Sequence, residues 1–412
     1  MYSKKINIDL IKKIKESFSK EIKETPLEYS GRLSKKYGCK IFLKREDLQL
    51  VRSYKIRGAF NAINKLGKNR EAGVVCSSAG NHAQGVALAC KIFKVSGHIF
   101  MPKTTPMQKI ERTKKFGGRY VKVILEGDVF DEAQKEALKF SREKGMNYIA
   151  PFDNMKVISG NSTIGLEILA QMSDLKEVPD IVIVPIGGGG LISGIASYIK
   201  KINPKIKIIG VEASGSASMS EAIKNNSPVE LSKIDTFADG VAVRKVGKLT
   251  FDIVKKTVDD IIIVPENRIS ATILKLLKEE GIILEPAGAL SINAIRDIPK
   301  KQLKNKTVVC VLSGGNLDFN RLPDIKERYL KFKGLKKHLT VFFPQRPSAL
   351  KEFVNCLGKN DNIVYFHYSE SEGIWGEARI AIETNKKENF GKLYKKLNKA
   401  KIRFLENGKN RI

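Results

Sequence analysis

The sequence predicts an α/β protein with parallel sheets, followed by a smaller α+β domain at the C-terminal end of the chain. Over the first 330 residues, short apolar strands alternate with helical stretches. Glycine-rich loops directly follow several of these strands, and the order of elements changes near residue 330. Alternating strands and helices favour parallel sheets covered on both faces. A chain of 412 residues is long enough for two or three domains.

The predicted strands of the first part are apolar runs bounded by Gly, Pro or charged residues. They are Ile41–Lys44, Gly73–Ser77, His98–Met101, Tyr120–Ile124, Ile181–Pro185, Ile206–Glu212, Ile261–Val264 and Thr307–Leu312. An amphipathic helix precedes them, and further helices lie between them. The clearest helical stretches are Ser53–Leu66, Asn81–Phe93, Asp128–Lys144, Leu191–Ile202 and Asn267–Glu280.

The tail has a different pattern. Glu327–Lys337 is charged and indicates a connecting helix or linker, after which the order is βαββαβ, that of a ferredoxin-like unit. Its predicted elements are Leu339–Pro344, Ser348–Leu357, Asn362–Ser369, Glu377–Thr384, Glu388–Lys399 and Ile402–Leu405. We predict a first domain over 1–328, with a small lobe inserted at roughly 50–150, a linker over 329–337 and a second domain over 338–412. The tail lacks glycine-rich loops, which indicates a binding or regulatory role.

Composition argues against a secreted or membrane protein. Apolar runs such as Ile181–Pro185 are far shorter than a membrane span. The N-terminus has no apolar signal core, and Asp9, Glu16 and Glu21 do not suit a transit peptide. The five cysteines form no C-x-x-C pair and no even-numbered framework. We therefore expect a cytoplasmic protein.

The net charge of +30 allows two interpretations. A strongly basic chain can bind nucleic acid or an anionic membrane. Here, however, the lysines are spread along the whole chain and are not interleaved with aromatic residues. The other interpretation is compositional drift: Lys, Ile and Asn are abundant throughout the chain, as in proteins from AT-rich genomes. We favour this interpretation, and we expect no nucleic-acid or membrane partner.

The first motif that could carry chemistry is S-Y-K-I-R-G-A, over Ser53–Ala59. A lone lysine in so basic a chain is usually a solvated surface residue. Lys55, however, opens a predicted helix beside small and apolar residues. A partly desolvated lysine has a lowered pKa and can attack a carbonyl carbon and carry protons. A hydrolase dyad of Ser53 and Lys55 is the alternative, but the chain shows no acyl-enzyme scaffold.

The second motif, S-S-A-G-N-H-A-Q-G over Ser77–Gly85, follows a strand and runs into a helix. Small residues let backbone N–H groups approach an anion, such as a substrate carboxylate, and the helix dipole favours negative charge there. The alternative is a plain N-cap, with His82 as a structural helix residue. Capping alone does not require this combination of residues. The candidate residues are Ser78, Ala79, Gly80, Asn81 and His82.

The third motif has four consecutive glycines after a buried strand and before a helix. Such a run forms a nest of N–H groups that can surround a phosphate. No Gly-Lys-Ser/Thr follows, so it is no nucleotide P-loop, and the spacing does not fit a dinucleotide fold. A flexible turn is the alternative, although open α/β sheets bind ligands at such strand ends. The loop consists of Gly187, Gly188, Gly189 and Gly190, followed by Leu191. A weaker signal, Ser313-Gly314-Gly315-Asn316, follows another strand.

In this order, the four motifs together resemble fold-type-II pyridoxal-phosphate enzymes, and among them the biosynthetic threonine dehydratases. F-P-Q-R-P-S-A-L, over Phe343–Leu350, with Phe353 after it, resembles the single ACT-like domain of their short form. Plain serine or catabolic threonine dehydratases and serine racemases lack this tail. The resemblance implies a two-lobed catalytic domain with an ACT-like regulatory domain. It also implies pyridoxal phosphate as cofactor and conversion of L-threonine to 2-oxobutanoate and ammonia, the first step of isoleucine biosynthesis.

The resemblance also implies roles for individual residues. Lys55 is expected to bind the cofactor covalently and to act in catalysis, and Asn81 to hydrogen-bond the cofactor 3′-oxygen. Gly187–Leu191 is expected to hold the phosphate, and Ser313 to face the pyridine nitrogen. The loop Ser78–His82 is expected to bind the substrate carboxylate. No metal ligand is predicted.

Regulation and assembly follow from the same resemblance. It implies isoleucine or valine as an effector of the tail, and a homo-oligomer of two or four chains. Two positions depart from the family pattern. Gly160-Asn161-Ser162-Thr163 stands where Gly-Gln-Gly-Thr is usual, which affects the active-site wall, and Ser348 replaces the usual Gly after Arg-Pro, which affects effector binding. The alternatives are a serine/threonine dehydratase or serine racemase of the same fold, and a basic nucleic-acid-binding protein that has kept an enzyme scaffold.

Overall fold

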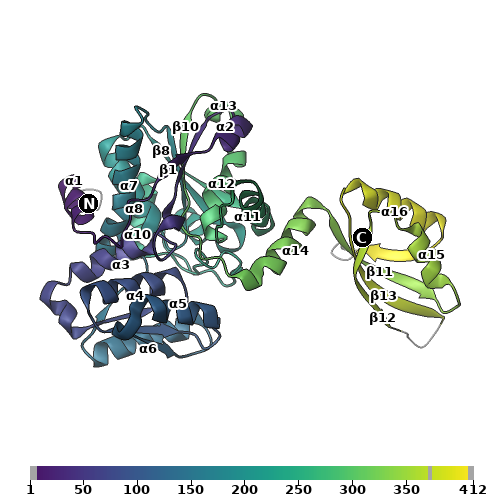
Figure 1. Ribbon diagram of the computed structural model, residues 1–412, viewed down its shortest axis with the longest axis horizontal. Helices are drawn as coiled ribbons and strands as arrows, with labels where there is room; N and C mark the ends of the chain where they lie inside the picture. Colours follow the sequence, from purple (N-terminus) through teal and green to yellow (C-terminus); the bar gives the residue numbers. More distant parts are fainter. Residues whose placement is uncertain (1–6, 370–373, 407–412) are drawn as a thin grey trace. The chain divides into compact units, whose positions relative to one another are not determined.

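The computed structural model describes residues 7–369 and 374–406 of the chain. The chain forms two compact units, an N-terminal unit that ends at Phe319 and a C-terminal unit that begins at Asn320 (Figure 1). The first six residues of the Lys-rich N-terminus lie outside the described residues.

The N-terminal unit contains a six-stranded sheet in the order β1-β2-β10-β7-β8-β9. Neighbouring strands are parallel, as predicted, except for β1 and β2, which are antiparallel. The edge strand β1 was not predicted because three residues are too few to show a strand pattern. The strands are β1 (Leu27–Tyr29), β2 (Lys40–Lys44), β7 (Ile181–Pro185), β8 (Lys207–Ala213), β9 (Asp260–Val264) and β10 (Thr307–Val311).

A second, smaller sheet makes up the other lobe of this unit. Its four strands are all parallel and follow the order β5-β4-β3-β6. The strands are β3 (Val74–Ser77), β4 (Gly97–Met101), β5 (Val121–Leu125) and β6 (Asn147–Tyr148). The two lobes confirm the two-lobed parallel-sheet fold that the resemblance implies (Figure 1).

Helices cover both sheets of the N-terminal unit. They are α1 (Ile8–Glu16), α2 (Gly31–Tyr37), α3 (Lys55–Asn64), α4 (Asn81–Phe93), α5 (Met107–Gly117), α6 (Phe130–Glu143), α7 (Met155–Asp174), α8 (Gly190–Ile202), α9 (Ser218–Lys224), α10 (Lys248–Thr257), α11 (Glu266–Glu280), α12 (Leu290–Ala294) and α13 (Lys300–Leu303). The sequence did not reveal α7 because its glycines and β-branched residues are weak helix formers. Those glycines let other helices approach closely: a Cβ on Gly160 would lie 2.4 Å from the carbonyl oxygen of Arg57 in α3.

A buried ion cluster fixes α3, the helix that begins at Lys55, to the larger lobe. Arg57 is fully buried and donates to both oxygens of Glu46, at 2.8 and 2.8 Å, and of Glu167, at 2.6 and 2.7 Å. Lys44, also fully buried, donates to Glu167 at 2.7 Å. Burial raises the pKa of Glu46, but Arg57 and Lys44 outweigh it and hold that pKa below its usual value. The cluster thus holds two cations and two carboxylates, so the buried charges neutralise each other.

The C-terminal unit begins with the helix α14 (Leu322–Lys333) and continues as an antiparallel sheet in the order β12-β13-β11-β14. Two helices pack on this sheet (Figure 1). Its elements follow the predicted βαββαβ order: β11 (Lys336–Pro344), α15 (Ala349–Cys356), β12 (Asn362–Ser369), β13 (Trp375–Glu383), α16 (Glu388–Lys399) and β14 (Arg403–Glu406). The segment 329–337, predicted as a linker, holds the end of α14 and the start of β11.

Ser348 immediately precedes α15 and has a φ of +67°, in the left-handed region. Glycine occupies this region at little cost, whereas other residues meet steric strain. The position is the one where the family usually has Gly. Ser348 therefore adopts a backbone conformation that best suits glycine.

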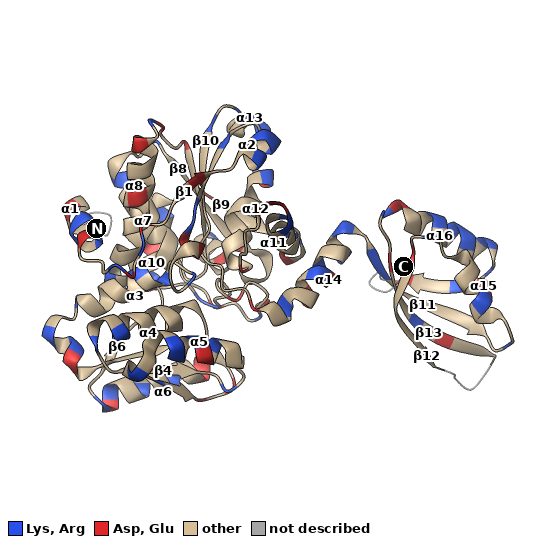
Figure 2. Ribbon diagram, viewed as in Figure 1, with Lys and Arg blue, Asp and Glu red and all other residues tan. Residues whose placement is uncertain are grey.

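Lys and Arg residues occur on helices and strands of both units (Figure 2). Several are paired, as Lys336 is with Glu327 and Glu383. Within the part of the chain that the structure describes, no helix has the length and apolar character of a membrane span.

We expect Arg57→Met to destabilise the N-terminal unit by about 3–5 kcal/mol, because it leaves two buried carboxylates facing only one cation. Urea unfolding followed by circular dichroism measures the change. Arg32→Met is the control, since Arg32 is partly exposed and pairs with Glu279 and Glu280 at the surface. Its loss should cost less than about 1 kcal/mol. Equal losses in the two variants would contradict the role assigned to the cluster.

Candidate active site

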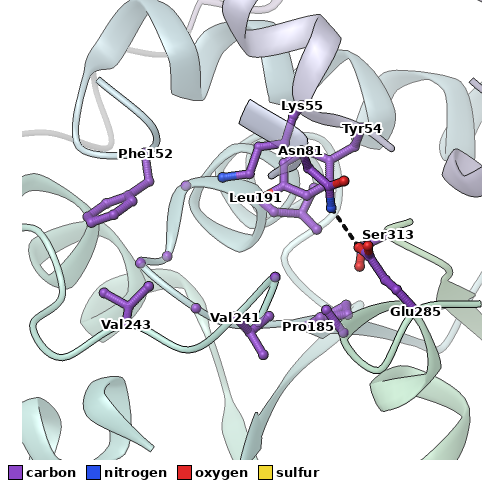
Figure 3. Close-up of a pocket in the computed structure, with 16 residues that line it drawn as sticks. Tyr54, Lys55, Asn81, Phe152, Pro185, Leu191, Val241, Val243, Glu285 and Ser313 are labelled. Carbon is purple, nitrogen blue, oxygen red and sulfur yellow. Dashed lines mark hydrogen bonds between the residues drawn. The ribbon is translucent and has the colours of Figure 1, made fainter. Parts of the chain in front are cut away.

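A largely enclosed pocket lies where the two lobes of the N-terminal unit meet (Figure 3). The predicted residues Lys55, Asn81, Gly187–Leu191 and Ser313 all line it. They come from regions far apart in the sequence. The remaining lining residues are Tyr54, Phe152, Pro185, Gly240, Val241, Val243, Glu285 and Ala287.

Lys55 is the first residue of α3 and extends into the pocket (Figure 3). The segment before it is held by the Ser313 loop: the Tyr54 N–H donates to the Ser313 carbonyl at 3.2 Å, and Ser53 forms a bridge with Gly314. The Lys55 amine donates to the Pro151 carbonyl at 3.0 Å. Burial lowers the pKa of Lys55 to about 8, although Glu285 opposes the shift. An uncharged amine is therefore accessible near neutral pH.

The four glycines connect the end of β7 to the start of α8. Gly189 has a φ of +89°, which disfavours any other residue. A Cβ on Gly188 would lie 2.4 Å from the Phe152 ring, and one on Gly187 would lie 2.8 Å from the Val241 Cα. The backbone of this tetraglycine loop is thus packed where side chains do not fit. Its place at the N-terminus of α8 favours an anion.

Asn81 and Glu285 lie in direct contact in the pocket lining (Figure 3). The Asn81 amide donates to the Glu285 carboxyl at 2.7 Å, and its oxygen accepts from Asn316 at 2.7 Å. Burial raises the pKa of Glu285 to about 7. We did not predict Glu285 as a site residue. A signal was present, because it is the only charged residue in the apolar stretch 281–290.

Phe152 and Tyr54 also line the pocket without having been predicted. Tyr54 lay within the first motif but carried no separate signal. Phe152 follows Pro151 in a stretch with no recognisable pattern, so the sequence alone offered no means of finding it.

The loop predicted to bind the substrate carboxylate contributes one residue, Asn81, to the pocket lining. The Ser78 hydroxyl oxygen accepts from the Gly80 N–H at 3.2 Å. His82 is buried, and its ring lies 2.9 Å from the Ile149 carbonyl. Burial lowers the pKa of His82 to about 3, so its ring is uncharged. His82 thus has the surroundings of a structural helix residue, and the carboxylate role of this loop stays a prediction.

These residues fit the cofactor that the resemblance implies. Pyridoxal phosphate carries an aldehyde, a phosphate and a pyridine nitrogen. The Lys55 amine with its lowered pKa suits the aldehyde, and the tetraglycine loop at the start of α8 suits the phosphate. The buried Ser313 hydroxyl suits an uncharged ring nitrogen.

Two family models match the chain. The first, described as pyridoxal-phosphate dependent enzyme, matches residues 18–314. The second, described as C-terminal regulatory domain of threonine dehydratase, matches residues 327–412.

Individual relatives and solved structures are similar to the chain over most of its length. The chain is 45% identical over 409 residues to L-threonine dehydratase biosynthetic IlvA of Halalkalibacterium halodurans, covering 98% of each chain. It is 43% identical to the protein of that name from Bacillus subtilis, covering 98% of this chain and 96% of the relative. Among solved structures, the processed form of threonine deaminase isoform 2 from Solanum lycopersicum is 41% identical, with a TM-score of 0.73, over 79% of this chain and 94% of that one. Maize serine racemase is 31% identical, with a TM-score of 0.71, over 79% and 98%.

The raised pKa of Glu285 predicts a pH-dependent stability. The folded protein holds this proton up to about pH 7, whereas an unfolded Glu has a pKa of 4.5. This contribution is therefore fully present below about pH 4.5 and is lost as the pH rises through 7. The loss amounts to about 3 kcal/mol, which Glu285→Gln should avoid. Urea unfolding of both proteins at several pH values measures it. A difference between them that does not grow as the pH rises would contradict the assignment.

Proposed function

Because the chain belongs to the family of pyridoxal-phosphate-dependent enzymes and ends in the regulatory domain of threonine dehydratase, we propose that it is a biosynthetic threonine dehydratase. It converts L-threonine to 2-oxobutanoate and ammonia, with pyridoxal phosphate as its cofactor. One observation supports this most strongly: the Lys55 amine, with its lowered pKa, shares an enclosed pocket with the tetraglycine loop.

The cofactor supplies an electron sink for the charge that develops when the Cα proton of the substrate leaves. Lys55 acts as the base that removes this proton, because its pKa near 8 makes the neutral amine available. Loss of the β-hydroxyl as water gives aminocrotonate, and its hydrolysis gives 2-oxobutanoate and ammonia. The tetraglycine loop holds the phosphate end of the cofactor.

Two further residues orient the ring. Asn81 has its amide group fixed on both sides, by Glu285 and by Asn316, and it would hydrogen-bond the 3′-oxygen of the cofactor. Ser313 lines the pocket and would offer a neutral hydroxyl to the pyridine nitrogen. A hydroxyl does not hold that nitrogen protonated as a carboxylate would, and this moderates the electron sink and suits β-elimination.

Serine racemase is the second candidate activity, since maize serine racemase shares the fold at 31% identity. The tail favours the dehydratase, because residues 327–412 match the regulatory domain of threonine dehydratase. Separate incubation with L-threonine and L-serine distinguishes them: the dehydratase forms 2-oxobutanoate from L-threonine, whereas a racemase forms D-serine.

We also propose that isoleucine, or valine, binds the C-terminal unit and lowers activity, that the enzyme assembles as a dimer or tetramer and that it works in the cytoplasm. The regulatory domain supports the first point. We likewise propose that the catalytic domain comprises residues 1–328 and the regulatory domain residues 338–412, joined by residues 329–337.

We expect Lys55→Ala to abolish formation of 2-oxobutanoate from L-threonine, together with the absorbance of the bound cofactor near the edge of the visible range. Lys65→Ala is the matched control, since Lys65 lies at the other end of α3 and is exposed. It should retain both signals. Turnover that persists in Lys55→Ala would contradict the assignment of the base.

L-Isoleucine should lower the activity of the unmodified enzyme by at least about fivefold, as is typical of coupling between two sites. Titration against L-threonine turnover measures this effect, with D-isoleucine as the control. Calorimetry with Lys55→Ala should still detect L-isoleucine binding, because the effector is expected to bind the C-terminal unit. The absence of both effects would leave the tail without the proposed role.

A further inference from the structure

We propose that Thr250 and Asn161 are positioning residues for the cofactor phosphate, which act by fixing the peptide groups of the tetraglycine loop. The inference rests on the proposed function for the identity of the ligand. It goes beyond that function because it proposes that two residues outside the loop determine the shape of the phosphate site.

Three of the four glycine carbonyls accept hydrogen bonds from groups outside the loop. The Thr250 hydroxyl of α10 donates to the Gly188 carbonyl at 2.7 Å. The Asn161 amide of α7 donates to the Gly190 carbonyl at 3.2 Å. The Gly189 carbonyl accepts the N–H of a residue in α8 at 2.9 Å.

The N–H groups of the loop show the opposite pattern. Among residues 7–369 and 374–406, none accepts a hydrogen bond from the N–H groups of Gly187, Gly188, Gly189, Gly190 or Leu191. Backbone donors in so enclosed a place require partners. An anion in the pocket would supply them.

Peptide geometry links the two observations. The carbonyl of one residue and the N–H of the next lie in one plane and point in opposite directions. A bond from Thr250 to the Gly188 carbonyl therefore directs the Gly189 N–H to the other side of the loop. The bond from Asn161 to the Gly190 carbonyl does the same for the Leu191 N–H. Glycine peptides rotate at little cost, so without these bonds the loop would sample other orientations.

Thr250 is itself held in place. Thr250 is fully buried, and its own N–H donates to the Asp153 carboxylate at 3.1 Å. The same carboxylate oxygen accepts the Leu249 N–H at 3.0 Å, so Asp153 caps the first turn of α10. Asp153 directly follows Phe152, whose ring packs against the loop. The wall and the loop of the phosphate site are therefore one connected structure.

Asn161 is 2% exposed and sits on α7 between α3 and α8. It is also one of the positions at which the chain departs from the usual Gly-Gln-Gly-Thr. Its amide donates to the Gly190 carbonyl from this buried position.

The test compares the affinity of the cofactor-free full chain for pyridoxal phosphate and for pyridoxal, which lacks the phosphate. Thr250→Val keeps the shape of the side chain and removes its hydroxyl, whereas Thr250→Ser keeps the hydroxyl. Thr257→Val is the matched control, because Thr257 is buried in the same helix and its hydroxyl donates to the Ile253 carbonyl at 2.8 Å, away from the loop.

Thr250→Val should weaken binding of pyridoxal phosphate by about tenfold, which corresponds to 1.4 kcal/mol, and leave that of pyridoxal nearly unchanged. Thr250→Ser should restore most of the lost affinity, and Thr257→Val should alter neither. Asn161→Leu should show the same selective loss, which keeps the inference testable if Thr250→Val does not fold.

Equal weakening of both ligands would overturn the inference, since it would indicate general damage to the pocket. Unchanged affinity for pyridoxal phosphate in both variants would overturn it as well. An unmodified protein that fails to bind pyridoxal phosphate would overturn the proposed function together with the inference, so the two failures are distinguishable.

Discussion

The structure of the N-terminal unit depends on one constraint, the removal of the Lys55 amine from solvent. Lys55 reaches a pKa near 8 because it is buried between two lobes, and its nearest described partner is a backbone carbonyl rather than a carboxylate. A salt bridge at this place would restore the charged form and remove the base. The fold must therefore carry Lys55 at the start of a firmly held helix while keeping full negative charge away from its amine.

Other buried charges are arranged so that they do not disturb this amine. Arg57, two residues along α3, is neutralised by Glu46 and Glu167 and anchors the helix to the larger lobe. Glu285 is the acid that acts on Lys55 from within the pocket, and its own raised pKa keeps it partly protonated near neutral pH. His82 is uncharged. The pocket thus combines a weakly basic amine, a weakly acidic carboxyl and an N–H nest for an anion.

The sequence revealed those parts whose cause is local. β7, α4, β12 and α16 have the predicted bounds, because apolar runs and amphipathic periods end at clear Gly, Pro or polar signals. The tetraglycine loop was visible for the same reason. Features that depend on tertiary contact were not. α7 is stabilised by the close approach of α3 and α8 rather than by its helix propensity, and Glu285 acquires its properties only through burial beside Asn81. Loop residues Ser78–His82 were grouped by sequence, but the structure separates Asn81 in the pocket from His82 in the core.

The most direct test of this account is to find the lysine that carries the cofactor. Borohydride treatment of the cofactor-loaded enzyme makes the link permanent, and peptide mass spectrometry then locates the added mass. We expect one major labelled site, Lys55, with the same site unlabelled when L-threonine is present in excess. A label on another of the chain's many lysines, with Lys55 unmodified, would contradict the central claim.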